Sequence, residues 1–424
     1  MEKGGTMSNN ETIFNSVKAR YGELGVDVEK ALDKLGSITL GIHAWQGDDV
    51  RGFESDAFTL TGGCLVTGNY PGCARNADEL RQDLDLALRL IPGRHKVGLQ
   101  GHQVDKMFPG VDRDGFTIDN FRSWLDWAKE KKIGMDIAPA FYGHPKLDHN
   151  LSLAHPDPAI REFWIRHGIN MRKIGEVFGK ELGMPAIVNF WMPDGFKDTP
   201  ADRLAPRQRM MEALDRCFAE KIDPAYERDT VEQKLFGIGV ESCTVGSHEF
   251  FMLYAATRGK ILCFDTGHFH PTEQVGDKLS AVLSMMKEVF LHVSRGVRWD
   301  SDHVIVVNDD LLLLAREAVA NGYLDRIHFG LDYFDATINR IAAWVIGARD
   351  FQKALLIALL EPSCAKEAEK AFDFTSRLAL QEASKTLPWG VVWDEFCKRK
   401  DVPSDFDFMK EIKAYEKSVL AARS

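Results

Sequence analysis

The sequence has little that would tie it to a membrane, an oxidising compartment or nucleic acid. No apolar run approaches the roughly 18 residues that a membrane-spanning helix needs. The seven cysteines are dispersed without a Cys-x-x-Cys pair, which indicates reduced, mostly buried thiols and a cytoplasmic location. The polar first ten residues lack the apolar segment of a signal peptide. A formal net charge of −10 argues against nucleic acid or membrane partners and favours a small-molecule partner.

Two glycine-rich signals for phosphate groups are also missing. No G-x-G-x-x-G turn follows the first predicted strand, residues 38–45, which argues against a doubly wound dinucleotide-binding sheet. No phosphate-binding glycine turn follows the seventh or eighth predicted strand, which disfavours phosphorylated substrates. The open, doubly wound sheet is the main alternative fold.

What the sequence does contain is a regular alternation of helical and short apolar segments. After the first strand, helices are predicted at residues 78–90, 119–132, 159–182, 207–222, 248–257, 277–286 and 309–321. A strand is predicted after each of them, at residues 97–104, 135–140, 186–191, within 231–240, and at 261–265, 289–294 and 326–332. Eight strands separated by helices indicate a parallel sheet, and eight units over roughly 300 residues suit a closed (β/α)8 TIM barrel.

The chain divides into three predicted parts. Residues 1–35 form an N-terminal leader and helix, residues 36–342 the barrel catalytic domain, and residues 343–424 an α-helical C-terminal extension. Within the extension, helices are predicted at residues 351–360, 366–387 and 407–421. We expect the extension to contact the barrel or a neighbouring subunit.

Acidic and imidazole side chains collect where the predicted strands end, the edge at which barrels of this class place their active sites. Glu232 and Lys234 are two residues apart, as are Asp300 and Asp302, so on strands each pair points to one face. Carboxylates directed into one cavity repel one another unless a cation neutralises them. The acids at these ends are Glu232, Asp265, Asp300, Asp302 and Asp332, enough for two divalent cations such as Mn²⁺, Mg²⁺, Co²⁺ or Zn²⁺.

The residues alone leave the ligand set open. Glu241 replaces Glu232 if the fifth strand ends later than we assign it. His270 and His303 are also ligand types, although each stands beside a stronger candidate. These polar residues could instead be ordinary loop residues that follow buried strands.

Longer motifs resemble those of bacterial L-rhamnose isomerases and, more distantly, the xylose isomerase group. The matching stretches are HAWQGDD at 43–49, LTGG at 60–63, TGNYPG at 67–72, DRLAPRQR at 202–209, GHFHPTE at 267–273, HVSR at 292–295, VRWDSDH at 297–303 and NRIAAWVIG at 339–347. The resemblance implies a homotetrameric barrel enzyme that interconverts the aldose L-rhamnose and the ketose L-rhamnulose, with relaxed specificity for other aldoses possible, and uses two divalent ions per subunit. Mn²⁺ is the expected ion, with Zn²⁺, Co²⁺ or Mg²⁺ as alternatives.

The resemblance also implies roles for single residues. A structural ion would be held by Glu232, Asp265, His292 and Asp332, and a catalytic ion by His268, Asp300 and Asp302. Lys234 would lie near the carbonyl oxygen O1, so the catalytic set is Lys234, Asp302 and His268. Because most of the acids are then ligands, a hydride shift is favoured over an ene-diol route, which needs a free carboxylate beside C2.

One position departs from the family pattern. The second strand usually ends in a histidine near the sugar ring oxygen, whereas this chain has Gln100 there and His102 two residues later. We predict that His102 contacts the substrate together with Trp191, His43 and Trp45. The alternatives are altered ring opening and sugar recognition, and a role for His43 and Trp45 in simply plugging the barrel.

Two other functions compete with the isomerase. The same barrel could serve another metal-dependent sugar enzyme, such as an aldolase, epimerase or hydrolase. A non-catalytic sugar-binding protein is the alternative from a different class. Such a protein would normally have lost one or more metal ligands, whereas every expected ligand type is present in this chain.

Overall fold

A computed structural model describes residues 9–54, 64–236, 240–297 and 302–423. Its centre is a closed barrel of eight strands with parallel neighbours, in the order β1-β10-β9-β8-β6-β4-β3-β2. The strands are β1 (Thr39–His43), β2 (Arg94–Gln100), β3 (Gly134–Ala138), β4 (Ala186–Trp191), β6 (Glu227–Glu232), β8 (Ile261–Asp265), β9 (Val289–Val293) and β10 (Ile327–Leu331). The predicted (β/α)8 barrel is confirmed, and the open doubly wound sheet is wrong.

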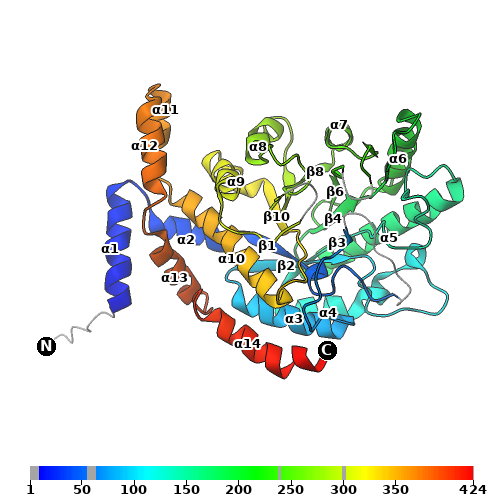
Figure 1. Cartoon of the computed structure of the whole chain (residues 1–424), viewed down its shortest axis with the longest axis horizontal. Helices are drawn as coiled ribbons and strands as arrows, with labels where there is room; N and C mark the ends of the chain where they lie inside the picture. The colour runs from blue at the N-terminus through cyan, green and yellow to red at the C-terminus, as the bar shows by residue number, and fades with distance from the viewer. Residues whose placement is uncertain (1–8, 55–63, 237–239, 298–301, 424) are drawn as a thin grey trace.

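Helices surround this barrel (Figure 1). They are α3 (Ala77–Leu90), α4 (Arg122–Lys131), α5 (Pro158–Leu182), α6 (Leu204–Cys217), α7 (His248–Arg258), α8 (Gly276–Leu283), α9 (Asp309–Ala320) and α10 (Arg340–Leu359). Local sequence fixes several ends: the Asn76 side chain accepts a hydrogen bond from the Glu79 amide at the start of α3. Gly183 ends α5 with a left-handed φ of 68°, which glycine adopts without steric cost.

The fifth barrel strand differs from its prediction. We placed it within residues 231–240, but β6 spans Glu227–Glu232. The charged residues Arg228 and Asp229 hide the apolar pattern of this strand, and the structure explains them. Asp229 accepts hydrogen bonds from Arg172 (2.6 Å) and from Lys260 (2.5 Å), so its charge is neutralised at the amino end of the barrel. Two short strands, β5 (Gly195–Phe196) and β7 (Cys243–Thr244), form a separate antiparallel pair.

The chain ends in four helices: α11 (Cys364–Lys370), α12 (Phe374–Ser384), α13 (Trp389–Arg399) and α14 (Phe408–Ser418). The extension is helical as predicted, but the single helix expected at 366–387 is two helices, separated by Phe372 with a left-handed φ of 58°. Helix α13 was not predicted. Two more helices, α1 (Asn9–Glu23) and α2 (Val28–Ser37), precede β1. The domain boundaries at 35/36 and 342/343 remain predictions.

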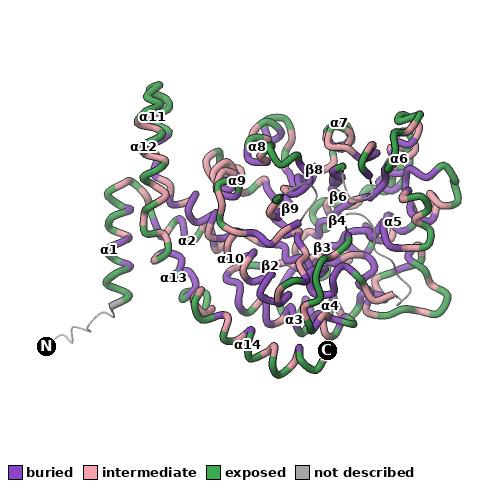
Figure 2. The backbone as a smooth tube through the Cα atoms, in the orientation of Figure 1, coloured by how far each residue is buried: buried purple, intermediate pink, exposed green. Residues whose placement is uncertain are grey.

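Helix α10 and the terminal helix α12 differ in how far they are buried. Helix α10 is buried over most of its length, and Trp344 donates a hydrogen bond to the carbonyl of His43 at the end of β1 (2.7 Å). Helix α12 has no buried residue, and Figure 2 shows it with exposed and intermediate surfaces, whereas α1 buries Phe14, Val17 and Tyr21. Among the described residues, none of the helices is both long and apolar enough to cross a membrane.

Candidate active site

Four predicted ligands lie at neighbouring strand ends because parallel strands present their carboxyl ends at one edge. Glu232 ends β6, Asp265 ends β8, His292 lies near the end of β9, and Asp332 follows β10. Asp265 and His292 are directly paired across the β8–β9 ladder. This register brings side chains that are 100 residues apart in sequence, from Glu232 to Asp332, to one point above the barrel core.

These four side chains form the first cluster, and their ligand atoms all lie within 4.8 Å of one another. His292 Nδ1 lies 3.0 Å from Glu232 Oε2, 3.1 Å from Asp332 Oδ2 and 3.9 Å from Asp265 Oδ2. The Asp265 side chain is 0% exposed, and Glu232 and His292 are also buried. Three carboxylates and one imidazole therefore converge, and of the four only Asp332 is partly exposed.

A second cluster adjoins the first and shares Asp265 with it. It consists of Asp265, His268 and Asp302, again with ligand atoms within 4.8 Å. His268 Nδ1 lies 3.0 Å from the Gln233 carbonyl oxygen, and the ring is thereby held over the end of β6. Asp302 has a left-handed φ of 33°, an unusual conformation for a residue with a side chain. Asp300, the remaining predicted ligand, lies outside the described residues.

Without a cation, the charges of this centre are poorly balanced. Burial raises the pKa of Asp265 well above its ordinary value, and the neighbouring Asp332 and Glu232 charges add to the rise, against the opposing effect of His268. Burial alone would lower the pKa of His292, yet it lies well above its ordinary value because Cys263, Glu232 and Asp332 favour the protonated ring. The imidazole thus takes the positive charge that the surrounding acids require.

Orphaned polar atoms test whether a cation fits. Among the described residues, the buried atoms Glu232 Oε1, Asp265 Oδ2 and His292 Nδ1 make no hydrogen bond of normal geometry, although His292 Nδ1 lies within ion-pair distance of three carboxylates. Buried polar atoms are normally satisfied, and the exceptions need an explanation such as an ion. Oxygen donors with one imidazole are the set that divalent Mn, Mg, Co or Zn ions accept. The residues present fit a divalent metal.

Neighbouring polar groups hold the ligands in place. Trp45 Nε1 donates to Asp332 Oδ1 (2.8 Å), and Asn189 donates to Glu232 Oε2. Thr266 Oγ1 donates to the Ser294 carbonyl (2.8 Å) and accepts from the Ser294 amide (2.7 Å), so it ties the ends of β8 and β9 together. Such supporting contacts fix the orientation of metal ligands.

Gly267 is required by this close packing. A Cβ atom at this position would lie 2.8 Å from Ser294 Oγ and 3.0 Å from Asp302 Oδ1. The bare backbone instead lets the Gly267 amide donate to Asp265 Oδ1 at 2.6 Å. The glycine of the GHFHPTE motif therefore allows the two clusters to approach each other.

A cleft of about 460 Å³, partly open to solvent, leads to the clusters. One wall carries ligands of both clusters, and the other is largely apolar and aromatic. Trp191 meets Tyr142 edge to face at 5.7 Å, and Lys234 Nζ lies 5.8 Å from the centre of the Trp191 ring. The lining residues are Trp45, Val50, Cys64, Gln100, Ala138, Pro139, Tyr142, Asn189, Trp191, Glu232, His268, His292, Asp302, Asp332 and Phe334. This cleft suits a small polar molecule with some apolar surface.

The predicted substrate residues occupy different depths. Trp45 and Trp191 line the cleft, whereas His43 lies below it, with Nε2 2.5 Å from the Tyr333 carbonyl oxygen. His102 is fully buried behind Tyr142, with ring centres 5.3 Å apart, and its Nε2 lies 2.9 Å from the Val50 carbonyl oxygen. Gln100 lines the cleft where His102 was expected. The substrate contacts of all four predicted residues remain predictions.

The alternative ligands are placed differently. Glu241 and His270 are exposed, and His303 is half-buried. Among the described residues, none of the three joins either cluster. Sequence reasoning did not single out Asn189 or Cys263, although both are buried against Glu232. Cys263 could have been found, because it lies two residues before Asp265 and so faces the same side of β8.

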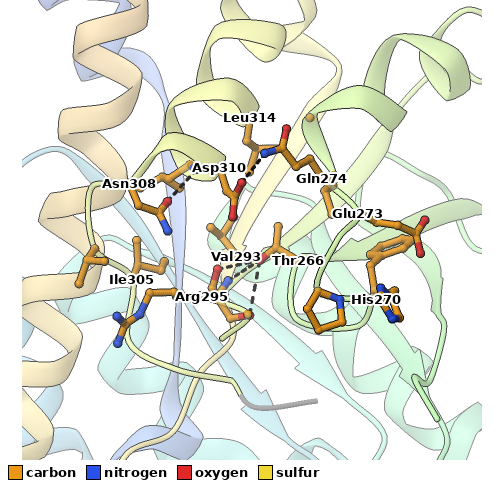
Figure 3. Close-up of a pocket in the computed structure, with 18 residues that line it drawn as sticks. Thr266, His270, Glu273, Gln274, Val293, Arg295, Ile305, Asn308, Asp310 and Leu314 are labelled. Atoms are coloured by element: carbon orange, nitrogen blue, oxygen red, sulfur yellow. Dashed lines mark hydrogen bonds between the residues drawn. The ribbon is translucent and has the colours of Figure 1, made fainter. Parts of the chain in front are cut away.

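A separate cavity lies on the helix side of the two strand ends, between β8, β9, α8 and α9 (Figure 3). Its space measures about 650 Å³, including the part open to solvent, and its lining includes Thr266, Gln274, Arg295, Asn308 and Asp310. Gln274 Nε2 donates to Asp310 Oδ1 (2.5 Å) across this cavity. No member of either cluster lines it among the described residues, so the cleft and this cavity are distinct.

The barrel and its acid–imidazole clusters define a class of protein, a (β/α)8 protein with candidate metal-binding residue groups at the carboxyl ends of its strands. Comparison with known proteins gives the family. The family model for L-rhamnose isomerase (RhaA) matches residues 8–423. This chain belongs to the L-rhamnose isomerase family.

Individual relatives agree with this assignment over almost the whole chain. L-rhamnose isomerase of Listeria innocua serovar 6a is 53% identical, with 97% of this chain and 98% of the relative covered. L-rhamnose isomerase of Shigella sonnei strain Ss046 is 49% identical, with 97% and 99% covered. Among solved structures, an L-ribulose 3-epimerase has a TM-score of 0.46 at 13% identity, covering 78% of this chain and 97% of its own, a likeness too weak to support an argument.

Proposed function

We propose that this chain interconverts L-rhamnose and L-rhamnulose as a metal-dependent aldose–ketose isomerase. Family membership over residues 8–423 supports the substrate pair. The observation that carries the chemistry is the meeting of both clusters at Asp265 beside one cleft. An aldose has a carbonyl and a hydroxyl on adjacent carbons, and isomerisation requires charge stabilisation on both oxygens together.

We propose that the centre holds two divalent ions, with Mn²⁺ the preferred one. Glu232, Asp265, His292 and Asp332 would hold one ion, and His268 and Asp302, together with Asp300, the other. Such an ion supplies Lewis-acid polarisation of the neighbouring sugar oxygens. The mixed oxygen and imidazole donors also accept Co²⁺, Zn²⁺ or Mg²⁺, so the choice depends on affinity and supply.

The protein groups around the clusters have separate tasks. The Lys234 ammonium group, beside Trp191, would stabilise negative charge that develops on O1 of the sugar. A water molecule hydrogen-bonded to Asp302 would carry the proton between O2 and O1 of the sugar. Trp191 and Tyr142 would pack against the sugar and keep bulk water from C1 and C2.

The hydrogen on carbon moves, in this proposal, as a hydride between C2 and C1. The acids described at the site, Glu232, Asp265, Asp302 and Asp332, all belong to the two clusters, which leaves none of them free as a carbon base. L-Rhamnose deuterated at C2 distinguishes the routes. A hydride shift delivers the deuterium to C1 of the ketose, whereas an ene-diol route exchanges it with solvent.

The whole enzyme is proposed to be a cytoplasmic homotetramer. The cytoplasmic location is supported by dispersed thiols, none of which is paired in a disulfide in the part of the chain that the structure describes. The exposed apolar side chains Phe374 and Leu378 on α12 support subunit contacts outside the barrel. Light scattering and sedimentation of the purified protein measure the subunit number directly.

A turnover assay tests the proposed function. Protein loaded with Mn²⁺ should produce ketose from L-rhamnose, and a chelator should abolish this production until Mn²⁺ is restored. Asp302→Asn should keep sugar binding and lose turnover by about 10²-fold or more. Sugar binding with no turnover in the parent would instead indicate a binding protein, and turnover of another sugar substrate would indicate a different barrel enzyme.

A further inference from the structure

A buried thiol lies directly beneath the first cluster. Cys263 is 0% exposed and is paired with Glu232 in the β6–β8 ladder. Its Sγ donates a hydrogen bond to Glu232 Oε2 at 3.7 Å. Because Cys263 precedes Asp265 by two residues, its side chain faces the same barrel interior, one strand repeat deeper.

The thiol has two ligand-type neighbours at coordinating range. Cys263, Glu232 and His292 offer ligand atoms that all lie within 4.8 Å of one another, and we call this set the thiolate site. Its members are buried, and His292 Nδ1 lies 3.0 Å from Glu232 Oε2. Glu232 Oε2 accepts from Asn189 and Cys263, whereas the buried Oε1 makes no hydrogen bond of normal geometry, which is a second sign that this carboxylate is placed for an ion.

Two of the three donor-to-donor distances are close to the edges of a small coordination tetrahedron. Zinc bonds of about 2.3 Å to sulfur and about 2.0 Å to nitrogen or oxygen give ligand-to-ligand edges of roughly 3.3–3.5 Å. The observed sulfur-to-oxygen distance of 3.7 Å and nitrogen-to-oxygen distance of 3.0 Å lie on either side of that range. Along these two edges, the distances differ from the ideal values by a few tenths of an ångström.

We propose that Cys263, Glu232 and His292 form an alternative, thiophilic metal site that captures Zn²⁺ or Cd²⁺ beneath the first cluster. Soft thiolate selects such ions, whereas Mn²⁺ and Mg²⁺ prefer oxygen ligands. The proposal rests on the proposed metal centre, because two of its three ligands also belong to the first cluster.

The two positions are mutually exclusive because both need the same nitrogen of His292, and one imidazole nitrogen binds one ion. An ion at the thiolate site takes Glu232 and His292, and leaves only Asp265 and Asp332 of the first cluster for Mn²⁺. A thiophilic ion at the thiolate site therefore prevents Mn²⁺ from binding at the first cluster, although the two ions would occupy different positions. Cys263 sets which cations inhibit the enzyme, although it does not touch the sugar cleft in the described structure.

Metal binding to the full-length protein tests this directly. Co²⁺ and Cd²⁺ bound to thiolate give sulfur-to-metal charge-transfer absorption, which oxygen and nitrogen ligands do not give. The parent should show this absorption, and Cys263→Ser should lose it. In Cys263→Ser, Cd²⁺ should bind about 10- to 100-fold more weakly. Mn²⁺ affinity should change by less than about threefold, because manganese prefers oxygen ligands.

Cys217→Ser is the matched control. Cys217 is also fully buried, lies on α6 and directs its Sγ to the Ile165 carbonyl oxygen (3.8 Å). This variant should keep the charge-transfer band and the Cd²⁺ affinity of the parent. Absence of the band in the parent, its persistence in Cys263→Ser, or equal loss of Mn²⁺ and Cd²⁺ binding in Cys263→Ser would each overturn the proposal.

A measurement on the unaltered protein covers the case in which Cys263→Ser does not fold. X-ray absorption of the zinc-loaded parent should show one sulfur neighbour at about 2.3 Å from zinc. A zinc shell of nitrogen and oxygen alone contradicts the thiolate site. The isomerase assay with Mn²⁺ in the same preparation separates the outcomes: turnover without a sulfur neighbour rejects only the thiolate site, whereas no Mn²⁺ binding and no turnover reject the proposed function.

Discussion

At the scale of single residues, Asp265 has the most demanding position in the molecule. It belongs to both clusters, is completely buried, and stands beside two other acids. Burial and the charges of Asp332 and Glu232 raise its pKa, so its ionised form is costly unless a cation is present. The carboxylate shared by both clusters is thus one whose ionised form destabilises the metal-free protein.

Asp265→Asn should therefore separate stability from function. The amide removes a buried charge, so the metal-free variant should unfold at the same temperature as the parent or a few degrees higher. Stabilisation by Mn²⁺ should fall by at least about 10-fold in apparent affinity, because a shared ligand is lost. Calorimetry with and without Mn²⁺ measures both effects, with the exposed Asp198→Asn as control. Unchanged Mn²⁺ stabilisation in Asp265→Asn would contradict the assignment.

Buried histidines outside the two clusters make the folded protein less stable at acid pH. Burial lowers the pKa of His95 to about 4, although its hydrogen bond to the Ile91 carbonyl opposes this. In the unfolded chain this histidine binds a proton at an ordinary pKa of about 6.5, whereas in the folded chain it stays neutral down to about pH 4. The free energy of unfolding therefore falls as the pH drops from 6.5 towards 4. Each such histidine adds a slope of up to about 1.4 kcal/mol per pH unit in that window.

His95→Gln tests this sign. The free energy of unfolding, measured by urea at pH 7 and pH 5, should fall less on acidification in the variant than in the parent. Glutamine can still donate to the Ile91 carbonyl, so stability at pH 7 should change by only about 1 kcal/mol. An equal or steeper loss in the variant would show that His95 is protonated in the folded state.

At the scale of elements, one buried arginine connects two loops of the cleft. Arg113 donates to the carbonyl oxygens of Ala140 (2.5 Å), Tyr142 (2.6 Å) and Gly143 (3.1 Å) after β3. It also forms a two-bond pair with Glu54, in the loop that follows β1. These loops supply the apolar wall of the cleft opposite the metal ligands.

Replacing Arg113 should disturb the apolar wall of the cleft more than it disturbs the metal ligands. Arg113→Met leaves three carbonyl groups and the Glu54 carboxylate without this donor, at a cost of about 3–5 kcal/mol in unfolding free energy. Arg113→Lys should fold better and raise KM for the sugar more than it lowers kcat. Urea unfolding and steady-state kinetics measure these changes, with the exposed Arg203→Met as control. A loss confined to kcat would contradict a role in shaping the cleft.

Element prediction succeeded where the apolar pattern was simple. Strands such as β8 and β9 are uninterrupted apolar runs between glycine-marked helices, and they were predicted within about one residue. Strand β6 was misplaced because Arg228 and Asp229 are charged yet satisfied by contacts distant in sequence, among them Arg172. Gln100 lines the cleft where His102 was predicted to do so. Which of the two side chains faces the cleft depends on the backbone path after β2, and the spacing of residues in the sequence does not determine that path.

At the scale of the whole molecule, the barrel closes around its site while the terminal helices leave apolar surface exposed. Phe374 and Leu378 on α12 are 51% and 58% exposed, and Phe372 is 80% exposed. Contiguous exposed apolar side chains are typical of subunit contacts. Sequence predicted the extension as helical, but contacts between copies depend on surfaces that one chain does not reveal.

A double substitution tests this surface. Phe374→Asp with Leu378→Asp should shift the protein from the proposed tetramer to smaller species, since burying two charges at an interface is costly. The free energy of unfolding of the monomer should change by less than about 1 kcal/mol, because both positions are exposed. Light scattering measures the mass of the particle in solution. Lys385→Asp, at the end of α12, is the milder control. An unchanged mass would exclude α12 from the interface.

The central claim is that acids and imidazoles from separate strands hold paired divalent cations beside the sugar cleft. Anomalous scattering from a crystal grown with Mn²⁺ tests it most directly. We predict two peaks, one contacted by Glu232, Asp265, His292 and Asp332, the other by His268, Asp300 and Asp302. The absence of both peaks in crystals of protein that turns over L-rhamnose, or peaks away from these side chains, would contradict the account.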